Sequence, residues 1–302
     1  MYLPTLLFFV GLLPGAAVEP HVDMAYDQLG RLFFTIGDSS GHAVLYYLDA
    51  TRQAHRLPLK TKAERIVFGH DPDGVLYGAE TRDYRRWGEY EVLIWRVDRG
   101  DAAPVLETVW PTWRRLGPFE WFAVDREKRF FLSFGSVIMR GEPGKTMEVF
   151  AGDRGGGPLA AKAPATRDGK GKQARIGKVA GMSWDGKGSL HFLDGDRLRL
   201  LKADGGVRTL PWRIEDSPRG NLRDLTWDGK MGFFAFAGAE PRLMRWNPGE
   251  SLPVSTPKGW RPAAVASRGK TLVVFERHIA NPTQFRIVRV RGDKRTLLFS
   301  KR

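Results

Sequence analysis

The sequence contains no cysteine among its 302 residues. This absence excludes disulfide bonds, thiolate metal ligands and cysteine nucleophiles, and it leaves no lipobox cysteine for a lipid anchor. Asparagine is also scarce and occurs only as Asn221, Asn247 and Asn281. No stretch of useful length has helical periodicity, and no low-complexity linker separates two domains. The fold must therefore depend on an apolar core, which a hydrophobic content of 42% supplies.

The N-terminus contains the longest apolar run, TLLFFVGLL, which is followed by the small residues of PGAAVEP. This pattern predicts a signal peptide over residues 1–17, cleaved after Ala17. An uncleaved membrane anchor is the alternative, but the run is short for a span and is interrupted by glycine and proline. We expect residues 18–302 to be a soluble exported protein, periplasmic or extracellular, with no membrane span and no lipid anchor.

Acidic residues are in the minority, with 34 Asp and Glu against 48 Lys and Arg and a formal charge of +14. Such a charge attracts polyanions. The positive residues are spread along the whole chain, and export would separate the protein from nucleic acid, so nucleic acid is not the expected partner. We expect a monomer that binds a protein, a glycan or an anionic polymer. A generic basic surface is the alternative.

Residues 168–210 show the clearest local pattern in the chain. Four short apolar runs, VAGMSW, SLHFLD, RLRLLKA and VRTL, are separated by turns rich in Asp and Gly. Within each run apolar residues alternate with small or polar ones, which is the period of a half-buried strand. The segment therefore predicts a four-stranded antiparallel meander.

The same pattern recurs along the rest of the chain, at intervals of about forty to sixty residues. We count six copies and predict one all-β domain, a six-bladed β-propeller of four-stranded antiparallel blades. The predicted blades cover residues 21–60, 63–109, 116–152, 176–212, 220–256 and 260–299. The apolar residue before each turn should pack between neighbouring blades, and these residues are Tyr26, Val124, Trp184 and Trp227.

The segment DGKGKQARIGKVAGMSWDGKGSLHFLDGDRLRLLKADGGVRTL resembles an NHL repeat. It has the DG-x-G-x-x-AR-aliphatic lead, the LxFxD strand and the closing V-x-TL of that family. The resemblance covers this blade closely and the others only in outline. It implies a six-bladed propeller of the TolB-like and gluconolactonase-like superfamily. It implies no activity, because propellers host lyases, hydrolases and binding modules alike.

Carboxylates near the predicted channel are candidate ligands for a divalent cation such as calcium. Asp23 and Asp224 occupy equivalent inner-strand positions, and Glu120 opens the third blade. Oxygen donors of this kind suit a hard cation. Glu120 resembles the glutamate of gluconolactonase-like propellers, whose site also uses two asparagines and an aspartate, but that full set is not recognisable here. The alternative, which we favour, is that each aspartate binds a backbone N–H or pairs with an arginine.

Arginine and tryptophan are concentrated in two segments of the second blade region. They are expected in the loop between its second and third strands and in the loop that leads to the next blade. The residues are Arg82, Arg85, Arg86, Trp87, Trp110, Trp113, Arg114 and Arg115. Exposed tryptophan is normally avoided, which points to a partner-binding surface. The alternative is that the two loops pack on each other through cation–π contacts.

Two readings of function follow from these residues. The leading one is a non-catalytic exported scaffold that presents a basic, Trp-rich face to an acidic, glycan or protein partner. The competing one is a metal-dependent propeller hydrolase or lyase with its site in the channel. His42 and His278, in similar loops of adjacent blades, are a further candidate acid/base pair. His191 alternates with apolar residues and is expected to be structural.

Overall fold

The structure is a computed structural model, and it describes most of the chain from Val22 onward. The described residues are 22–38, 40–57, 63, 65–71, 73–84, 89–97, 104–113, 119–153, 166–185, 188–213, 222–227, 232–236, 242–247, 250–269, 271–292 and 294–301. The predicted signal peptide, residues 1–17, lies outside this part. Within it, no helix has the length and apolarity that a membrane span needs.

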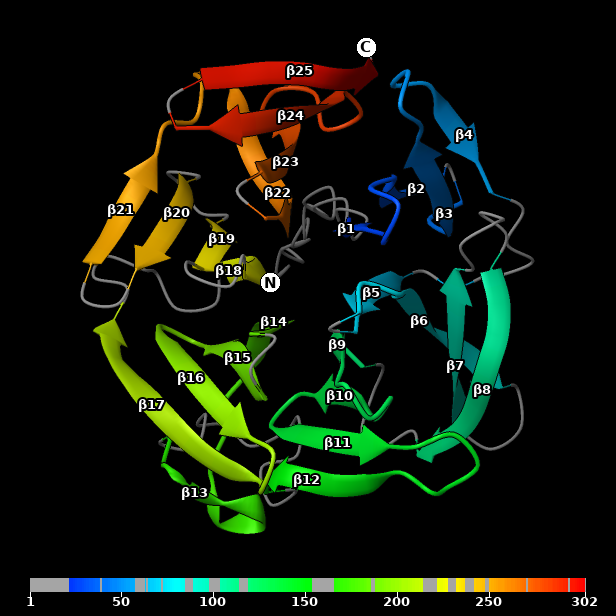
Figure 1. The fold of residues 1–302 in the computed structure, drawn as a ribbon, viewed down its shortest axis with the longest axis vertical. Helices are drawn as coiled ribbons and strands as arrows, with labels where there is room; N and C mark the ends of the chain where they lie inside the picture. Colours follow the sequence, from blue (N-terminus) through cyan, green and yellow to red (C-terminus); the bar gives the residue numbers. More distant parts are fainter. Residues whose placement is uncertain are drawn as a thin grey trace, which may run out of the picture.

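The described strands form five four-stranded antiparallel sheets and one sheet of five strands. Figure 1 shows the sheets arranged around a central axis, with β1, β5, β9, β14, β18 and β22 innermost. This is a β-propeller, so the predicted all-β class with four-stranded antiparallel blades is confirmed. Hydrogen-bonded neighbours within each sheet follow one another in the sequence, apart from β13.

Three sheets come from the first half of the chain. The β1–β4 sheet contains Met24–Tyr26, Leu32–Gly37, Ala43–Leu48 and Ala54–Arg56. The β5–β8 sheet contains Ile66–His70, Leu76–Tyr84, Glu89–Val97 and Pro104–Trp113. The β9–β12 sheet contains Trp121–Val124, Phe130–Phe134, Val137–Gly141 and Glu148–Gly152.

The other three sheets come from the second half. The β13–β17 sheet contains Gly169–Lys170, Val179–Trp184, Ser189–Asp194, Arg197–Lys202 and Gly206–Arg213. The β18–β21 sheet contains Leu222–Trp227, Gly232–Phe236, Arg242–Asn247 and Glu250–Val254. The β22–β25 sheet contains Trp260–Arg268, Thr271–His278, Phe285–Arg291 and Lys294–Lys301.

The Asp-Gly turns join the first and second strands of several sheets. In the turn after β1, the Asp27 carboxylate accepts a hydrogen bond from the backbone N–H of Arg31 at 2.8 Å. Gly30 in the same turn has φ +83°, a conformation that glycine adopts without steric cost. Asp185 holds Ser189 in the same way after β14, at 3.0 Å. The recurring D-x-x-G pattern is thus a turn device that fixes the register of each inner hairpin.

The Gly-rich lead before β14 contributes a strand that the four-stranded prediction did not include. β13 pairs with β17 on the outer edge of its sheet, and a short 3₁₀ helix, η2 (Gly171–Gln173), follows it. Arg199, which is fully buried, donates to the carbonyl oxygens of Arg175 at 2.6 Å and Arg167 at 2.9 Å. Arg199 therefore fastens the lead to the sheet, and β13 is its fifth strand because Gly169 and Lys170 pair with Val207 and Gly206.

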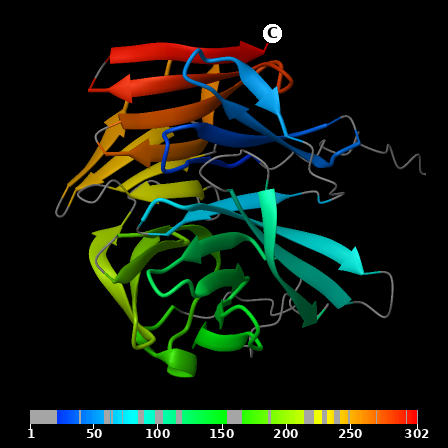
Figure 2. The same cartoon turned by 45° about the vertical axis from the view of Figure 1, so that its right-hand side comes forward.

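The β5–β8 sheet is longer than the sequence pattern predicted. β6 and β7 each have nine residues and β8 has ten, whereas β10, β11 and β12 have five each. Cross-strand pairing continues to Tyr84 and Glu89, and Trp113 pairs with Glu89. Arg82, Trp110 and Trp113 thus lie in strands rather than in loops. Figure 2 shows these strands extending beyond the neighbouring sheets.

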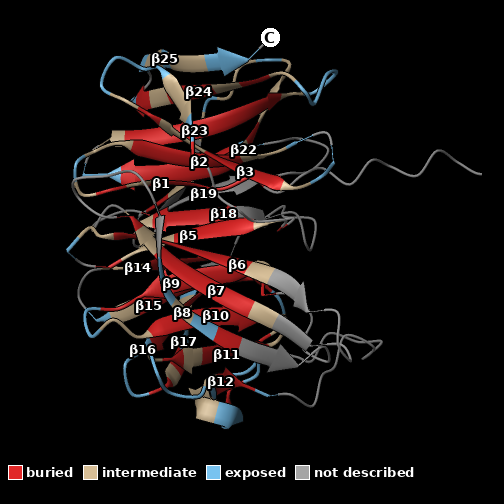
Figure 3. Cartoon of the chain, turned by 90° about the vertical axis from the view of Figure 1, so that its right-hand side faces the viewer, coloured by how far each residue is buried: buried red, intermediate tan, exposed pale blue. Residues whose placement is uncertain are grey.

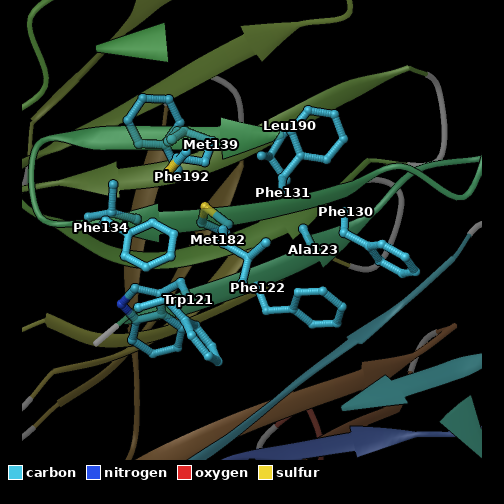
Figure 4. Close-up of a cluster of buried hydrophobic side chains, with 14 of the residues drawn as sticks. Trp121, Phe122, Ala123, Phe130, Phe131, Phe134, Met139, Met182, Leu190 and Phe192 are labelled. Atoms are coloured by element: carbon cyan, nitrogen blue, oxygen red, sulfur yellow. The ribbon is translucent and has the colours of Figure 1, made fainter. Parts of the chain in front are cut away.

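Apolar clusters fill the spaces between neighbouring sheets. Figure 4 shows the largest, in which Phe122, Phe130, Phe131 and Phe192 interdigitate across adjacent sheets. Figure 3 shows the strands buried along most of their length. Such packing is required because neighbouring sheets exclude water only when large side chains fill the space between them.

The residues before the turns pack between sheets, as the sequence predicted. Tyr26 packs against the cluster shared by the β1–β4 and β22–β25 sheets, and Val124 belongs to the largest cluster. Trp184 stacks on Phe131 at 5.7 Å between ring centroids. The predicted register of the inner strands is confirmed at these positions.

The first and last sheets meet through side chains. Met24 and Phe34 share an apolar cluster with Phe275 and Phe285. At the rim, Arg268 Nη2 donates to the carbonyl oxygen of Gln28 at 3.0 Å. Within the described residues, each of these two sheets consists of strands consecutive in the chain, and apolar packing joins the two sheets.

Candidate functional site

Asp23 lies at the start of the innermost strand β1 and is 4% exposed. Its Oδ1 accepts a hydrogen bond from the Met24 N–H at 2.7 Å. Its Oδ2 accepts one from the Phe68 N–H at 2.7 Å, which belongs to β5 of the neighbouring sheet. The carboxylate therefore bridges two sheets beside the channel.

Asp224 in β18 repeats this arrangement two sheets away, with the β22–β25 sheet between. Its Oδ1 accepts from the Leu225 N–H at 2.7 Å, and its Oδ2 accepts from the Val265 N–H in β22 at 2.8 Å. The equivalent position in β14 is Gly181, where an added Cβ would lie 2.7 Å from the Leu225 nitrogen. There the backbones approach too closely for any side chain to form such a bridge.

Glu120, the third predicted metal ligand, lies before β9 and is only partly buried. One of its carboxylate oxygens is 3.6 Å from Lys178 Nζ. Across the described ranges, no three His, Asp or Glu side chains come together in a group that could hold a metal ion. Both oxygens of Asp23 and of Asp224 already accept backbone hydrogen bonds. The structure thus gives each of these aspartates the backbone-binding role that the sequence had offered as the alternative.

Arg65 is a channel residue that the sequence analysis did not select. Its guanidinium lies over the Trp121 ring, 5.3 Å from the centroid, and interacts electrostatically with the carboxylates of Asp23, Asp224 and Glu120. Its buried Nε has no hydrogen-bond partner in the part of the chain that the structure describes. No signal in the sequence distinguishes it, because it is a single arginine before an apolar strand.

Burial sets the protonation chemistry of this cluster. It raises the pKa of Asp23 to about 6, although the Phe68 and Met24 N–H donors and Arg65 oppose the change. It also raises the pKa of Asp224 well above the usual value, and the charge of Asp23 adds to the effect. Desolvation lowers the pKa of Arg65 to about 10. The two aspartates therefore compete for negative charge near neutral pH.

The channel itself is narrow where the inner strands approach one another. A cavity of about 50 Å³ lies there, lined by residues of all six inner strands, Asp23, Trp121 and Asp224 among them. Such a space holds one or two water molecules. At this level the channel has no room for a substrate of ordinary size.

A wider basin of about 420 Å³ opens at the end of the channel that carries the Asp-Gly turns. Aromatic rings from Tyr26, Trp184 and Trp227 line it together with His70. Its carboxylates are already engaged. Asp71, for example, accepts from the backbone of Asp73 and Val75 and pairs with Lys128. The partner-binding residues predicted from the sequence lie in the second blade region and not in these tight turns.

The Arg- and Trp-rich surface predicted from sequence is only partly described. Arg85, Arg86, Trp87, Arg114 and Arg115 lie outside the described residues. Arg82 and Trp113 are placed in β6 and β8 by their backbones alone. Trp110 is 5% exposed, and its Nε1 donates to the Lys145 carbonyl at 2.7 Å. That side chain packs against Phe130 of the β9–β12 sheet, so it holds two sheets together.

The candidate histidines have separate surroundings. The His42 backbone N–H binds the Asp38 carboxylate in an exposed turn, whereas the His278 ring packs edge-on against Trp260 at 5.2 Å. His191 stacks on Trp227 at 4.3 Å with an interplanar angle of 7°. Burial lowers the pKa of His191 to about 4. It is thus a neutral packing residue at neutral pH, as predicted.

No protein-family model matches this chain, and no curated protein matches its sequence. Several solved structures resemble it. A putative TolB from Agrobacterium tumefaciens is 14% identical, covers 83% of this chain and 85% of its own, and has a TM-score of 0.53. The β-propeller domain of the Trilobed protease from Pyrococcus furiosus is 12% identical over 91% of this chain and 80% of that one, with a TM-score of 0.51.

The Aleuria aurantia lectin, solved in complex with Fucα1-6GlcNAc, is 9% identical. The match covers 92% of this chain and 94% of the lectin, with a TM-score of 0.56. A putative TolB, a protease domain and a lectin have different functions, so likeness at these identities carries no activity with it. What the comparisons establish is that this chain has the β-propeller fold.

Proposed function

We propose that the protein is a non-catalytic binding scaffold, a closed six-bladed propeller of the NHL type. In this proposal it acts after export, as a monomer, and binds an acidic, glycan or protein partner through the extended β6–β8 strands and the segments that join them. The observation that carries the proposal is the extension itself. The β6–β8 strands extend beyond the neighbouring sheets (Figure 2), and the sequence around their ends is rich in Arg and Trp.

The chemistry of this stretch fits an acidic partner. Arginine forks pair with carboxylates, sulfates and phosphates, and tryptophan rings stack on the apolar faces of sugars. The formal charge of +14 favours encounter with polyanions over a long range. Because Trp110 packs inside the sheet pair, the proposal rests on the arginines and on Trp87 and Trp113.

The features of the channel favour a partner-binding site elsewhere on the protein over a catalytic site inside the channel. Its narrow part has a volume of only about 50 Å³. Asp23 and Asp224 use both oxygens for backbone bridges between sheets. Metal analysis of the purified protein tests this point, and a stoichiometric calcium or zinc ion would instead favour a metal-dependent hydrolase or lyase.

The proposal is tested by joint replacement of four arginines by alanine. The test set is Arg85, Arg86, Arg114 and Arg115. A matched control removes the same charge at four arginines that are exposed on other sheets, namely Arg56, Arg126, Arg175 and Arg208. Binding to dextran sulfate and to polyphosphate, neither of which carries a carboxylate, is measured at two salt concentrations, with neutral dextran as the uncharged probe.

We expect the parent to bind the anionic polymers more weakly as salt rises, and the test variant to lose at least tenfold in affinity. The control variant should lose much less. Equal binding by the test variant and the parent would reject the proposed surface. Equal losses in the two variants would show a non-specific effect of net charge.

A further inference from the structure

A groove of about 470 Å³ lies on the outer part of the β22–β25 sheet, beside the segment that follows β21. Its walls come from β24, β25 and the stretch around Pro257. Arg295 Nη1 donates to the Ser255 carbonyl at 2.6 Å and so fastens β25 to this stretch. The groove is far larger than the narrow part of the channel, and described residues line it.

A fully buried glutamate lies beneath this groove. Glu276 in β23 is 0% exposed, and its Oε2 accepts a hydrogen bond from Arg286 Nε at 2.7 Å. Its Oε1 accepts from Arg295 Nη2. One negative charge is thus held between two positive ones, which leaves a net positive charge at the base of the groove.

Each of the two guanidinium groups keeps a donor that the glutamate does not use. Arg286 Nη2 and Arg295 Nε are buried and have no hydrogen-bond partner within the described residues. Leaving a charged N–H group buried without an acceptor costs free energy. Both arginines also line the groove, so an oxyanion bound there would lie against their positive charge, and carboxylates form charge-assisted hydrogen bonds with guanidinium groups.

The rest of the lining adds charge, polar groups and an apolar surface. Lys301 is an additional cation, and no Asp or Glu is among the described residues that line the groove. Gln284 and Ser300 offer hydrogen bonds to hydroxyl groups. Trp260 holds the Arg286 guanidinium at 4.1 Å from its ring centroid, and the Leu297 side chain is 51% exposed. This combination suits a ring that carries hydroxyls and one negative charge.

We propose that this groove binds a small carboxylated saccharide, with Arg286 and Arg295 as the carboxylate donors and Lys301 as a supporting cation. The site lies on a different sheet from the β6–β8 surface and does not depend on it. The variant that lacks Arg85, Arg86, Arg114 and Arg115 should therefore bind such a saccharide as the parent does. A failure of one proposal leaves the other standing.

The test uses the full chain with glucuronate as the probe, followed by ligand-observed NMR and calorimetry. Glucose, which lacks the carboxylate, and inorganic phosphate, which lacks the ring, are the comparison ligands. We expect saturable binding of glucuronate, little binding of glucose, and weaker binding of phosphate. Phosphate binding as strong as that of glucuronate would overturn the saccharide assignment.

Two variants and one control variant test the charged residues of the groove. Lys301→Ala should weaken glucuronate binding about threefold to tenfold, whereas Lys172→Ala, an exposed lysine in η2, should leave it unchanged. Arg286→Gln alone removes one fork and leaves Glu276 paired with Arg295, so no buried charge loses its last partner, and it should abolish binding. No saturable binding at millimolar glucuronate, or equal affinities of the two lysine variants, would overturn the proposal even if the Arg286→Gln protein did not fold.

Discussion

Buried carboxylates in two regions of this propeller are stabilised by different partners. Beside the channel, Asp23 is held by backbone N–H groups of two sheets. In the second strands of two sheets, Asp194 pairs with Arg199 and also accepts the Gly177 and Lys178 N–H groups, and Glu276 pairs with two arginines. Backbone donors carry only partial charge, so they satisfy the hydrogen bonds of a carboxylate without neutralising its charge. An arginine side chain supplies both the hydrogen bonds and the neutralising charge.

The two kinds of partner affect the protonation of the carboxylates differently. Burial raises the pKa of Asp23 to about 6, which brings its titration close to neutral pH. Burial also raises the pKa of Asp194, although the hydrogen bond and the charge of Arg199 oppose the change. Asp23 can therefore respond to pH near neutrality, and its bond to Phe68 joins two sheets, whereas the Asp194–Arg199 and Glu276–Arg286 pairs each lie within one sheet.

The largest effect is expected for Arg199→Ala. This change leaves Asp194 buried without its cation and frees the carbonyls of Arg167 and Arg175. Breaking one side of a buried pair costs roughly 3–5 kcal/mol of unfolding free energy. Urea denaturation measures it. A double variant, Asp194→Asn with Arg199→Gln, should recover part of the loss, and an Arg199→Ala protein as stable as the parent would contradict this role.

The next effect is expected at His191. Its protonation changes in the same pH range as that of Asp23, so the two contributions to stability must be measured separately. Its pKa falls from 6.5 to about 4 on folding because it is buried. Between these values the unfolded chain binds a proton that the folded chain does not, so stability falls by up to about 3 kcal/mol as pH falls. His191→Phe keeps a ring against Trp227 and should remove this dependence in urea titrations at pH 4 to 7.

Asp23 should show the opposite sign, with a contribution of about 2 to 3 kcal/mol. Its folded pKa of about 6 lies above the unfolded value of 3.8. The folded protein therefore binds the extra proton, and this contribution is present below pH 4 and is lost as pH rises to 6. Asp23→Asn, made in the His191→Phe background, should be better tolerated at pH 7 than at pH 4. Asp73→Asn, at an exposed position, is the control.

The smallest effect is expected for an exposed pair. Arg140 binds Glu148 at the surface, where the Glu148 side chain is 59% exposed. Solvent and salt screen such a pair, so Glu148→Gln should change stability by no more than about 1 kcal/mol. If Glu148→Gln cost as much stability as Arg199→Ala, burial would not explain why the Arg199–Asp194 pair matters more than an exposed pair.

Local pattern was enough to predict much of the fold. Alternating apolar residues predicted the inner hairpins, and the D-x-x-G motifs predicted their turns, because both depend on neighbours in the sequence. The packing of Tyr26, Val124 and Trp184 between sheets also followed from their place before the turns. The backbone role of Asp23 and Asp224 was one of two alternatives that the sequence left open.

Contacts between distant segments could not be predicted in this way. The sequence indicated loops where β6 to β8 continue as strands, because charged and aromatic residues at the ends of long strands resemble loop composition. Trp110 was assigned to a binding surface, yet it packs on Phe130. Arg65 gave no signal, since its environment is made by carboxylates from three other sheets.

The sequence by itself determined the strand periodicity, the turn chemistry and the absence of disulfides, since these depend on residue type and on short spacings. The tertiary structure decided which charges are buried together. Glu276 meets Arg286 and Arg295 only because three strands align in one register, and Asp23 meets the Phe68 N–H only because two sheets pack side by side. Desolvation depends on what surrounds a group in space, so the electrostatics of the channel and of the outer groove appear only in the folded ring.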